Sequence, residues 1–239
     1  MRVVLTRSPE DIQKDREVFE REGFEVIALP LIQEVPLHFE VPRVEFDFVV
    51  FQSPRAVRLF LSKYRLDGEK VVVVGEKTKR EVERFGYEVW AMPEDYYGKE
   101  LLKIFRGLSG KVLLPRSGVG RDEVVEGLRE LGLEVYPLEV YTLKEKIYER
   151  GELVEKLSGA DAVLFASPSA LKGLLANLQK EDIKRLLAGK VLVCLGKTTE
   201  DFLKETLCLY CHTPEKPTLE KVVELLKTMA LKLHNINGE

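Results

Sequence analysis

The sequence predicts an α/β protein with two similar domains, each a roughly five-stranded parallel sheet flanked by helices, joined by a two-stranded linker. Two observations carry this prediction. Short apolar runs alternate with charged amphipathic segments along the 239 residues, and continuous apolar runs are typical of parallel strands buried on both faces. The alternation also repeats within the chain, which indicates two related sheets.

The first unit reads strand, helix, strand over residues 2–30. After the first strand, Ser8 and Pro9 favour the N-cap and the first position of a helix, and this helix ends at Gly23. Residues 111–137 repeat the unit at a constant offset of 109, so that Gly23 matches Gly132. We therefore expect a βαβ unit at both places.

Two further units repeat with small insertions. In each copy one strand runs into a Ser-Pro helix start, a second runs into a Gly-x-x-Thr helix, and a last strand and a closing helix follow. Because Ser at an N-cap accepts a backbone N–H, each Ser-Pro pair is expected to cap its helix. The strands and turns are 48–51, Ser53-Pro54, 71–74, 75–78 and 87–91 in the first copy, and 162–165, Ser167-Pro168, 192–195, 196–199 and 208–212 in the second.

Two extended segments, 31–36 and 138–146, lie outside the helical pattern and are the candidate linkers. If both connect domains, the domains are not the two halves of the sequence. Residues 37–137 then form an inserted domain, and residues 1–30 join 147–239 in a discontinuous one.

Composition excludes several classes of protein. The net charge is −3 and no long Lys/Arg run occurs, so no nucleic-acid partner is expected. No apolar run reaches membrane-spanning length and no signal peptide precedes the first strand, so we expect a cytoplasmic protein without a membrane partner. The charged content of 32% suits the ion-pair networks of a thermophilic source. No exposed apolar helix is evident that would require a partner, so a monomer is expected.

The three cysteines do not suggest a disulfide scaffold. Cys208 and Cys211 precede His212 in the spacing of a c-type haem attachment, but this segment is an expected strand, in which positions i and i+3 point to opposite faces. Haem attachment and a Cys208–Cys211 redox pair are therefore both disfavoured. Cys194 lies in an apolar run and is predicted to be a small core residue.

Other cofactor signatures are missing, so neither a cofactor nor a metal is expected. Gly196-Lys197-Thr198 resembles the end of a phosphate-binding P-loop, but Val191 stands where that loop needs glycine. No Gly-x-Gly-x-x-Gly follows the first strand. The three histidines are scattered without a partner at ligand spacing, and no Gly-x-Ser-x-Gly nucleophile motif occurs.

Small, polar or cationic residues stand at the carboxyl ends of the strands, where ligands bind in open α/β sheets. Helix N-termini at these ends can bind carboxylates or phosphates, so six such turns favour a polyanionic small molecule. At any one turn, helix capping alone explains the residues equally well. Tyr141, in the second linker segment, is the phenol that could take part in catalysis. The alternative is a tyrosine packed at a strand edge. The candidate substrate-binding residues are Thr6, Arg7, Ser53, Lys77, Thr78, Arg116, Ser117, Ser167, Ser169, Thr198 and Thr199.

The ordered set of motifs resembles the uroporphyrinogen-III synthase family and spans nearly the whole chain. These motifs are Val4-Leu5-Thr6-Arg7, Phe51-Gln52-Ser53-Pro54-Arg55-Ala56-Val57, Val74-Gly75-Glu76-Lys77-Thr78, Val140-Tyr141-Thr142, Phe165-Ala166-Ser167-Pro168-Ser169-Ala170 and Leu195-Gly196-Lys197-Thr198-Thr199.

The resemblance implies a cofactor-free, lyase-type enzyme of tetrapyrrole biosynthesis that closes hydroxymethylbilane to uroporphyrinogen III with inversion of ring D. It makes Tyr141 the candidate catalytic acid, and it makes Thr78, Thr199, Ser53 and Ser167 binding residues for the eight carboxylates of the substrate. The preceding enzyme of the pathway is a candidate partner. The alternative from another class is a non-catalytic, hinged two-domain binding protein for a small polyanion.

Overall fold

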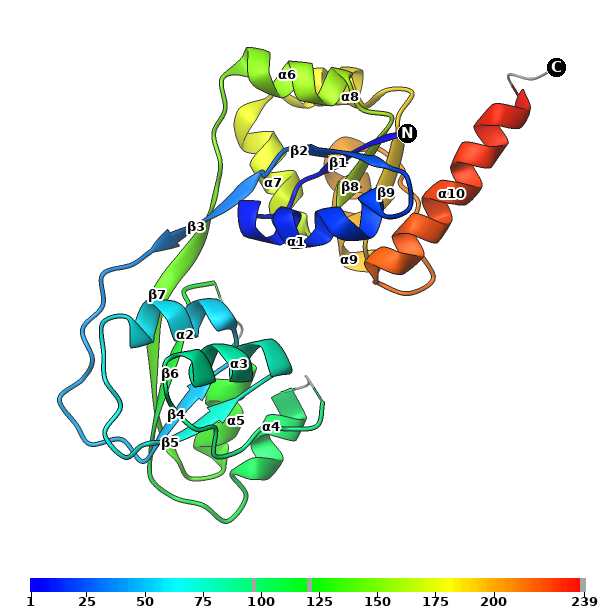
Figure 1. Cartoon of the computed structure of the whole chain (residues 1–239). Coiled ribbons are helices and arrows are strands. Elements are labelled where there is room, and N and C mark those ends of the chain that lie inside the picture. The colour runs from blue at the N-terminus through cyan, green and yellow to red at the C-terminus, as the bar shows by residue number, and fades with distance from the viewer. Residues whose placement is uncertain (96–97, 120–121, 237–239) are drawn as a thin grey trace. The chain divides into compact units, whose positions relative to one another are not determined.

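The computed structural model describes residues 1–95, 98–119 and 122–236. The chain forms two compact units: unit 1 comprises Met1–Gln33 and Lys144–Glu239, and unit 2 comprises Glu34–Leu143. Each unit is a sheet of mainly parallel strands flanked by helices, which confirms the predicted α/β class (Figure 1). In the part of the chain that the structure describes, no helix is long and apolar enough to cross a membrane.

The sheet of unit 1 has the order β2-β1-β8-β9, and all its neighbouring strands run parallel. Val4 lies opposite Ile27 on one side and Val163 on the other. The sheet is covered on both faces, so its strands are continuous apolar runs rather than alternating ones. The strands are β1 (Arg2–Leu5), β2 (Glu25–Ala28), β8 (Ala162–Phe165) and β9 (Val191–Cys194).

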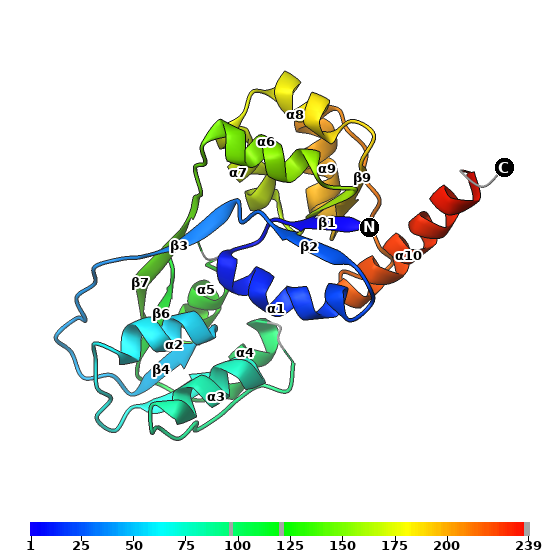
Figure 2. The same ribbon diagram turned by 45° about the horizontal axis from the view of Figure 1, so that its top comes forward.

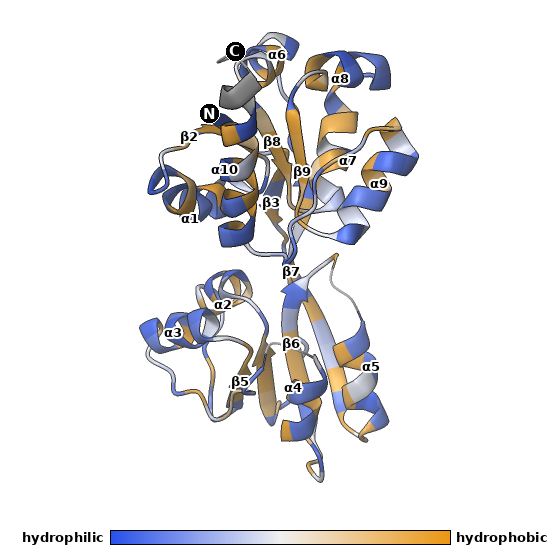
Figure 3. Cartoon of the chain, turned by 90° about the vertical axis from the view of Figure 1, so that its right-hand side faces the viewer, coloured by the Kyte–Doolittle hydropathy of each residue, from blue (hydrophilic) through white to orange (hydrophobic). Residues whose placement is uncertain are grey.

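Helices cover both faces of the unit 1 sheet (Figure 2). On one face α1 and α10 pack against Val3, Leu5 and Leu164, and on the other α6 to α9 pack against Val4 and Val163. Figure 3 shows the mainly hydrophobic strands β8 and β9 among helices that carry both hydrophilic and hydrophobic residues. The helices are α1 (Pro9–Glu20), α6 (Arg150–Ser158), α7 (Pro168–Asn177), α8 (Lys180–Leu187), α9 (Lys197–Leu207) and α10 (Leu219–Ile236).

The sheet of unit 2 has the order β3-β7-β6-β4-β5. The pairs β4–β5, β4–β6 and β6–β7 are parallel. Between β3 and β7, Leu37 N donates to Val140 O at 3.0 Å and Lys146 N donates to Leu31 O at 2.9 Å, so these strands run antiparallel. The strands are β3 (Ile32–Pro36), β4 (Phe48–Phe51), β5 (Lys70–Val73), β6 (Lys111–Ser117) and β7 (Glu134–Glu145).

The helices of unit 2 form two layers. On one face α2 and α3 pack against Val49, Phe51 and Leu113, and on the other α4 and α5 pack against Val50 and Val112. Unit 2 therefore repeats the three-layer architecture of unit 1. These helices are α2 (Pro54–Leu61), α3 (Glu76–Arg84), α4 (Gly98–Ile104) and α5 (Glu123–Glu130).

The last expected strand of each copy is reduced to a single bridge. Val72 pairs with Ala91 in unit 2, and Val193 pairs with His212 in unit 1. The prediction of full strands at 87–91 and 208–212 was therefore wrong. Pro93 and Pro214 follow the bridges closely, and because proline has no N–H to donate, the ladder cannot extend past them.

The chain passes between the units twice. The first passage is β3, which coincides with the expected linker at 31–36. The second is β7, a continuous strand of 12 residues that pairs with β6 from Glu134 to Tyr141. Most of the expected linker at 138–146 lies in this strand.

Candidate active site

The carboxyl ends of β4, β6 and β7 in unit 2 surround a pocket of about 350 Å³. The pocket collects Ser53, Arg116, Ser117 and Tyr141, four of the six candidate site residues in this unit. Lys77 and Thr78 are not among its lining residues. The residues around the pocket are Gln52, Ser53, Gly98, Pro115, Arg116, Ser117, Glu123, Val124 and Tyr141.

A larger hollow of about 740 Å³ lies at the opposite, amino edge of the same sheet. Its lining is acidic, with Glu45, Asp47, Asp67 and Glu69 around a single lysine, Lys70. Four carboxylates around one hollow repel a polyanion. The smaller pocket at the carboxyl edge, which contains an arginine and helix starts, is the better candidate for an anionic ligand.

Tyr141 is the buried phenol of this pocket. Its side chain lies among the apolar residues of the α2 and α3 layer, and the residue is 7% exposed. The phenol oxygen lies 3.4 Å from Ser53 Oγ, and either hydroxyl can be the donor. The hydroxyl group thus points from an apolar layer toward a polar turn, which is the usual position of a buried tyrosine that needs one partner.

Ser53 serves both the helix and the phenol. It is the N-cap of α2, with extended backbone, and its Oγ accepts the N–H of Ala56 at 3.2 Å. The next residues, Pro54 and Arg55, begin the helix, and Arg55 forms an ion pair with Glu34. The expected capping role of Ser53 is confirmed, and the charge of Arg55 is engaged within unit 2.

Arg116 is held at the end of β6 by two contacts. Its Nη1 donates to Asp122 Oδ1 at 2.9 Å and its Nε donates to the carbonyl oxygen of Ser117 at 3.3 Å. The side chain is only 10% exposed. Ser117 Oγ accepts the N–H of Val119 at 3.2 Å, which shapes the turn. Guanidinium groups bind carboxylates through charge-assisted hydrogen bonds.

The Gly-x-x-Thr turns of the two units match at their buried threonines. Thr78 and Thr199 are each 2% exposed. Lys77 and Thr198 precede them and are both exposed. The glycines differ, since Gly75 has a positive φ of 89° and Gly196 an extended φ of −148°. The two turns are therefore related in sequence but not identical in backbone.

In unit 1, the hydroxyl of Thr6 is part of the fold. It is buried and donates to Leu164 O at 2.7 Å, which ties the end of β1 to β8. Arg7 follows, and its guanidinium pairs with Asp15 at 3.0 Å and Asp11 at 3.4 Å. The positive charge of Arg7 is thus balanced within α1.

Ser167 differs from its counterpart Ser53. It occupies the N-cap of α7 with extended backbone, but its side chain makes no capping hydrogen bond. The expectation that both Ser-Pro serines cap their helices through Oγ is therefore wrong for Ser167. Ser167 is half-buried and Ser169 is exposed at the start of α7.

Lys197, at the start of α9, is surrounded by acidic residues. Its Nζ lies 3.0 Å from Asp201 and 3.6 Å from Glu200. The hydrogen bond to Asp201 and the charges of both carboxylates raise the pKa of the Lys197 ammonium above its ordinary value. Glu200 also accepts a hydrogen bond from Thr213 Oγ1 at 3.2 Å.

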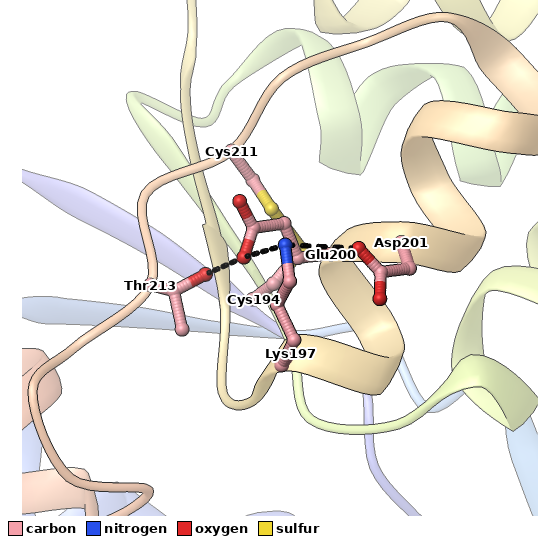
Figure 4. Close-up of a disulfide and its surroundings, with 6 residues drawn as sticks. All are labelled: Cys194, Lys197, Glu200, Asp201, Cys211 and Thr213. Atoms are coloured by element: carbon pink, nitrogen blue, oxygen red, sulfur yellow. Dashed lines mark hydrogen bonds and ion pairs between the residues drawn. A yellow bond between two sulfur atoms is a disulfide. The ribbon is translucent and has the colours of Figure 1, made fainter.

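Cys194 forms a disulfide with Cys211 (Figure 4). The prediction that Cys194 is only a small core residue was therefore incomplete. The bridge between Val193 and His212 brings the two chain segments side by side, and the Cα atoms of the cysteines are 5.9 Å apart, the usual spacing for a disulfide. Cys208 is exposed and free, so it forms no pair with Cys211.

Sequence reasoning missed five residues that line the pocket of unit 2, which are Gln52, Gly98, Pro115, Glu123 and Val124. Gln52 directly precedes Ser53, so its place beside the Ser-Pro turn could have been predicted. Gly98 and Glu123 stand at the starts of α4 and α5, and no signal in the sequence marks these helix starts as lining a pocket. Among the residues that the structure describes, no group of three metal-ligating side chains occurs.

Comparisons with known proteins agree with one another. Residues 13–224 match the family described as "Uroporphyrinogen-III synthase HemD". A chloroplastic uroporphyrinogen-III synthase of Oryza sativa subsp. japonica is 29% identical over 99% of this chain and 83% of its own length. A putative uroporphyrinogen-III synthase of Methanocaldococcus jannaschii is 27% identical over 96% of this chain and 99% of its own.

Solved structures show the same fold. The uroporphyrinogen-III synthetase of Helicobacter pylori has a TM-score of 0.65 at 19% identity and covers 87% of this chain and 93% of its own. A mutant uroporphyrinogen III synthase of Thermus thermophilus has a TM-score of 0.58 at 19% identity and covers 97% of this chain and 99% of its own. The motifs, the fold and the match over residues 13–224 together place the chain in the uroporphyrinogen-III synthase family, whose members are enzymes of tetrapyrrole synthesis that act on a small molecule.

Proposed function

We propose that the chain closes hydroxymethylbilane to uroporphyrinogen III with inversion of ring D, and that the pocket of unit 2 carries the chemical step. The observation that carries this proposal is the buried Tyr141 phenol next to Ser53, in one pocket with the fixed guanidinium of Arg116. A proton donor and a carboxylate-binding group lie together there. No comparable observation favours a non-catalytic binding protein.

Tyr141 is proposed to assist the departure of the substrate hydroxyl group. A phenol hydroxyl can donate a hydrogen bond or a proton to the leaving oxygen. The Ser53 hydroxyl, 3.4 Å from the phenol oxygen, keeps the phenol turned toward the polar turn. The hydroxyl leaves as water, and the remaining azafulvene is the electrophile that ring D attacks.

The electrophile is generated from the substrate itself, so we propose a lyase-type reaction that needs no cofactor. Ring D attacks to form a spiro intermediate, which reopens and closes again with the ring inverted. The bonds that break and form lie within the substrate and the released water. The remaining task of the enzyme is to hold the bilane so that the inverted closure is the nearest one.

Carboxylate binding is assigned to the helix starts and strand ends. In unit 2, Arg116 and Ser117 are proposed to bind one substrate carboxylate near Tyr141, and Lys77 and Thr78 to bind another. In unit 1 we assign the same role to Ser167, Ser169, Thr198 and Thr199, whose hydroxyls stand at the first turns of α7 and α9. Thr6 and Arg7 are weaker candidates, because their side chains are engaged within unit 1.

The test is the identity of the product. Hydroxymethylbilane closes without inversion when no enzyme is present, so the chain is supplied with freshly made hydroxymethylbilane and the ratio of type III to type I uroporphyrinogen is measured. We expect type III to predominate. The type I ratio of the enzyme-free control would refute the proposed activity.

A further inference from the structure

The Cys194–Cys211 disulfide joins two segments that backbone hydrogen bonds already hold together. His212 N donates to Leu192 O at 2.8 Å, and Cys194 N donates to His212 O at 2.9 Å. Cys194 is fully buried, whereas Cys211 is half-buried. The covalent bond therefore fixes the chain directly beside the end of β9, from which the Gly196–Thr199 turn begins.

Unit 2 contains the same bridge without a disulfide. At the internal offset of 121, Val73 and Trp90 stand where unit 1 has Cys194 and Cys211. Val73 N still donates to Ala91 O at 3.2 Å, and Trp90 N donates to Val71 O at 2.8 Å. In unit 2 the backbone pairing alone joins the two segments, whereas unit 1 adds a covalent bond beside the end of β9.

A chain of polar contacts begins two residues after Cys211. Thr213 Oγ1 donates to Glu200 Oε2 at 3.2 Å, and Glu200 lies 3.6 Å from Lys197 Nζ (Figure 4). Glu200 and Lys197 both belong to the first turn of α9, next to Thr198 and Thr199. Thr213 thus lies two residues from the disulfide and engages one oxygen of the Glu200 carboxylate.

The position of Glu200 matters because an uncompensated carboxylate at a helix start repels an anionic ligand. Thr213 and Lys197 engage this carboxylate in unit 1. In unit 2, the positions that match Glu200 and Thr213 are Lys79 and Met92. That turn has its carboxylate at Glu76, where unit 1 has Lys197, and it has neither the threonine nor the disulfide.

We propose that the Cys194–Cys211 disulfide is a redox-controlled clamp on the carboxylate-binding turn of unit 1. While the bond is intact, Thr213 holds Glu200 and the turn accepts a substrate carboxylate. Reduction frees the segment that contains Thr213, releases Glu200 and weakens substrate binding. This inference rests on the proposed role of Thr198 and Thr199 in binding the substrate.

The reductant is a dithiol. One of its thiolates attacks the more accessible sulfur, that of Cys211, and the S–S bond breaks with Cys194 as the leaving thiolate. The second thiol of the reductant then displaces Cys211 and closes a cyclic disulfide. Two electrons pass to the protein, and Cys194 and Cys211 end as thiols with two protons taken up.

The test uses the full chain with Cys208→Ser, which removes the free thiol and any exchange with Cys211. The oxidised and the dithiothreitol-reduced proteins are compared for accessible thiols, for KM and kcat with hydroxymethylbilane, and for amide hydrogen exchange at 196–201 and 208–213. We expect two additional thiols on reduction, faster exchange in both segments, and a KM raised about tenfold, as for one weakened charge-assisted hydrogen bond, at an unchanged kcat.

Two variants in the same background separate the clamp from mere stabilisation. Cys194→Val copies unit 2, and it should show the raised KM without any response to dithiothreitol. Thr213→Val keeps the disulfide and removes the hydrogen bond to Glu200, and it should show the raised KM in the oxidised protein. A disulfide with only a stabilising role would lower the melting temperature on reduction and leave KM unchanged.

The outcomes of this test also distinguish the clamp from the proposed function. The clamp is overturned if the unreduced, denatured protein has two free thiols, or if KM is unchanged after complete reduction. In either case, formation of type III product still supports the proposed function. Failure to form type III product refutes the function. In that case the clamp stands or falls on whether reduction accelerates hydrogen exchange at 196–201.

Discussion

The two Ser-Pro turns of this chain differ in the contacts of their serine hydroxyl groups. Ser53 Oγ accepts the N–H of Ala56 and lies 3.4 Å from the Tyr141 phenol oxygen, whereas Ser167 Oγ makes no capping bond. The two serines occupy matching N-cap positions, so their sequence context is nearly the same. Their different partners make each a control for the other.

Replacing Tyr141 tests the chemical step. We expect Tyr141→Phe to lower kcat at saturating hydroxymethylbilane much more than it raises KM, because phenylalanine keeps the ring and its packing but has no proton to donate. Steady-state kinetics on the purified variant gives both constants. An unchanged kcat would remove Tyr141 from the chemistry.

Replacing the two cap serines tests capping. Ser53→Ala should lower the free energy of unfolding by about 1 kcal/mol, the usual value of a lost N-cap hydrogen bond. Ser167→Ala should change it less, because no such bond is present. Urea unfolding of the two variants side by side measures the difference. We expect neither variant to abolish activity, since backbone N–H groups carry most of the anion binding.

At the scale of elements, the helix α7 approaches the backbone of Leu31 through Gly173. A Cβ built on Gly173 would lie 2.2 Å from the carbonyl oxygen of Leu31. The same carbonyl accepts the N–H of Lys146, where β3 and β7 pass beside each other. Glycine at this place allows the helix to pack directly on the entering chain.

We expect Gly173→Ala to destabilise the protein by about 1–3 kcal/mol, because a backbone carbonyl cannot move aside as a side chain can. The matched control is Gly151→Ala in α6, where the added Cβ meets nothing within 4 Å. Alanine there should stabilise the helix by about 0.5–1 kcal/mol. Thermal unfolding of both variants measures the two effects. Similar melting temperatures would contradict the close approach.

Local chemistry made much of the fold predictable. The Ser-Pro helix starts, the buried strands and the glycines that end α1 and α5 follow rules that act within a few residues. Partners distant in sequence were not predictable in this way. Thr6 bonds to Leu164 and Cys194 to Cys211 only because segments distant in sequence become neighbours, and the last expected strand of each copy is reduced to a single bridge.

The candidate site likewise contains residues that the sequence predicts and residues that it does not. Ser53, Arg116, Ser117 and Tyr141 carry signals at the ends of expected strands, and the structure places them around one pocket. Glu123 carries no such signal, because its place in the pocket depends on how α5 packs on the sheet. The acidic partners of Arg7 and Lys197 also needed helix geometry, in which residues three or four apart are neighbours.

At the scale of the whole molecule, the boundaries of the repeat and of the units differ. The repeat begins again near residue 111, whereas unit 2 runs from Glu34 to Leu143. Each unit thus combines the first part of one copy with the second part of the other. We propose that these units are the folding domains.

This proposal predicts which fragments fold. A fragment of residues 34–143 contains the strands β4 to β6, most of β3 and β7, and both helix layers of unit 2, so we expect a cooperative urea transition from it. A fragment of 1–110 follows the repeat boundary and splits both sheets. It should lack a cooperative transition. Circular dichroism during unfolding compares the two, and equal cooperativity would refute the assignment.

Because unit 1 is discontinuous in sequence, the two units become complete at different times during synthesis. The strand β1 leaves the ribosome early, but its partner β8 begins only at Ala162 and β9 ends at Cys194. At about 5–20 residues per second, these strands emerge seconds after unit 2 is complete. The enclosed unit therefore becomes available for folding first, while the amino-terminal βαβ segment waits with one edge of its sheet unpaired. Nascent chains stopped soon after Leu143 has emerged from the ribosome would carry one finished unit and an exposed strand edge.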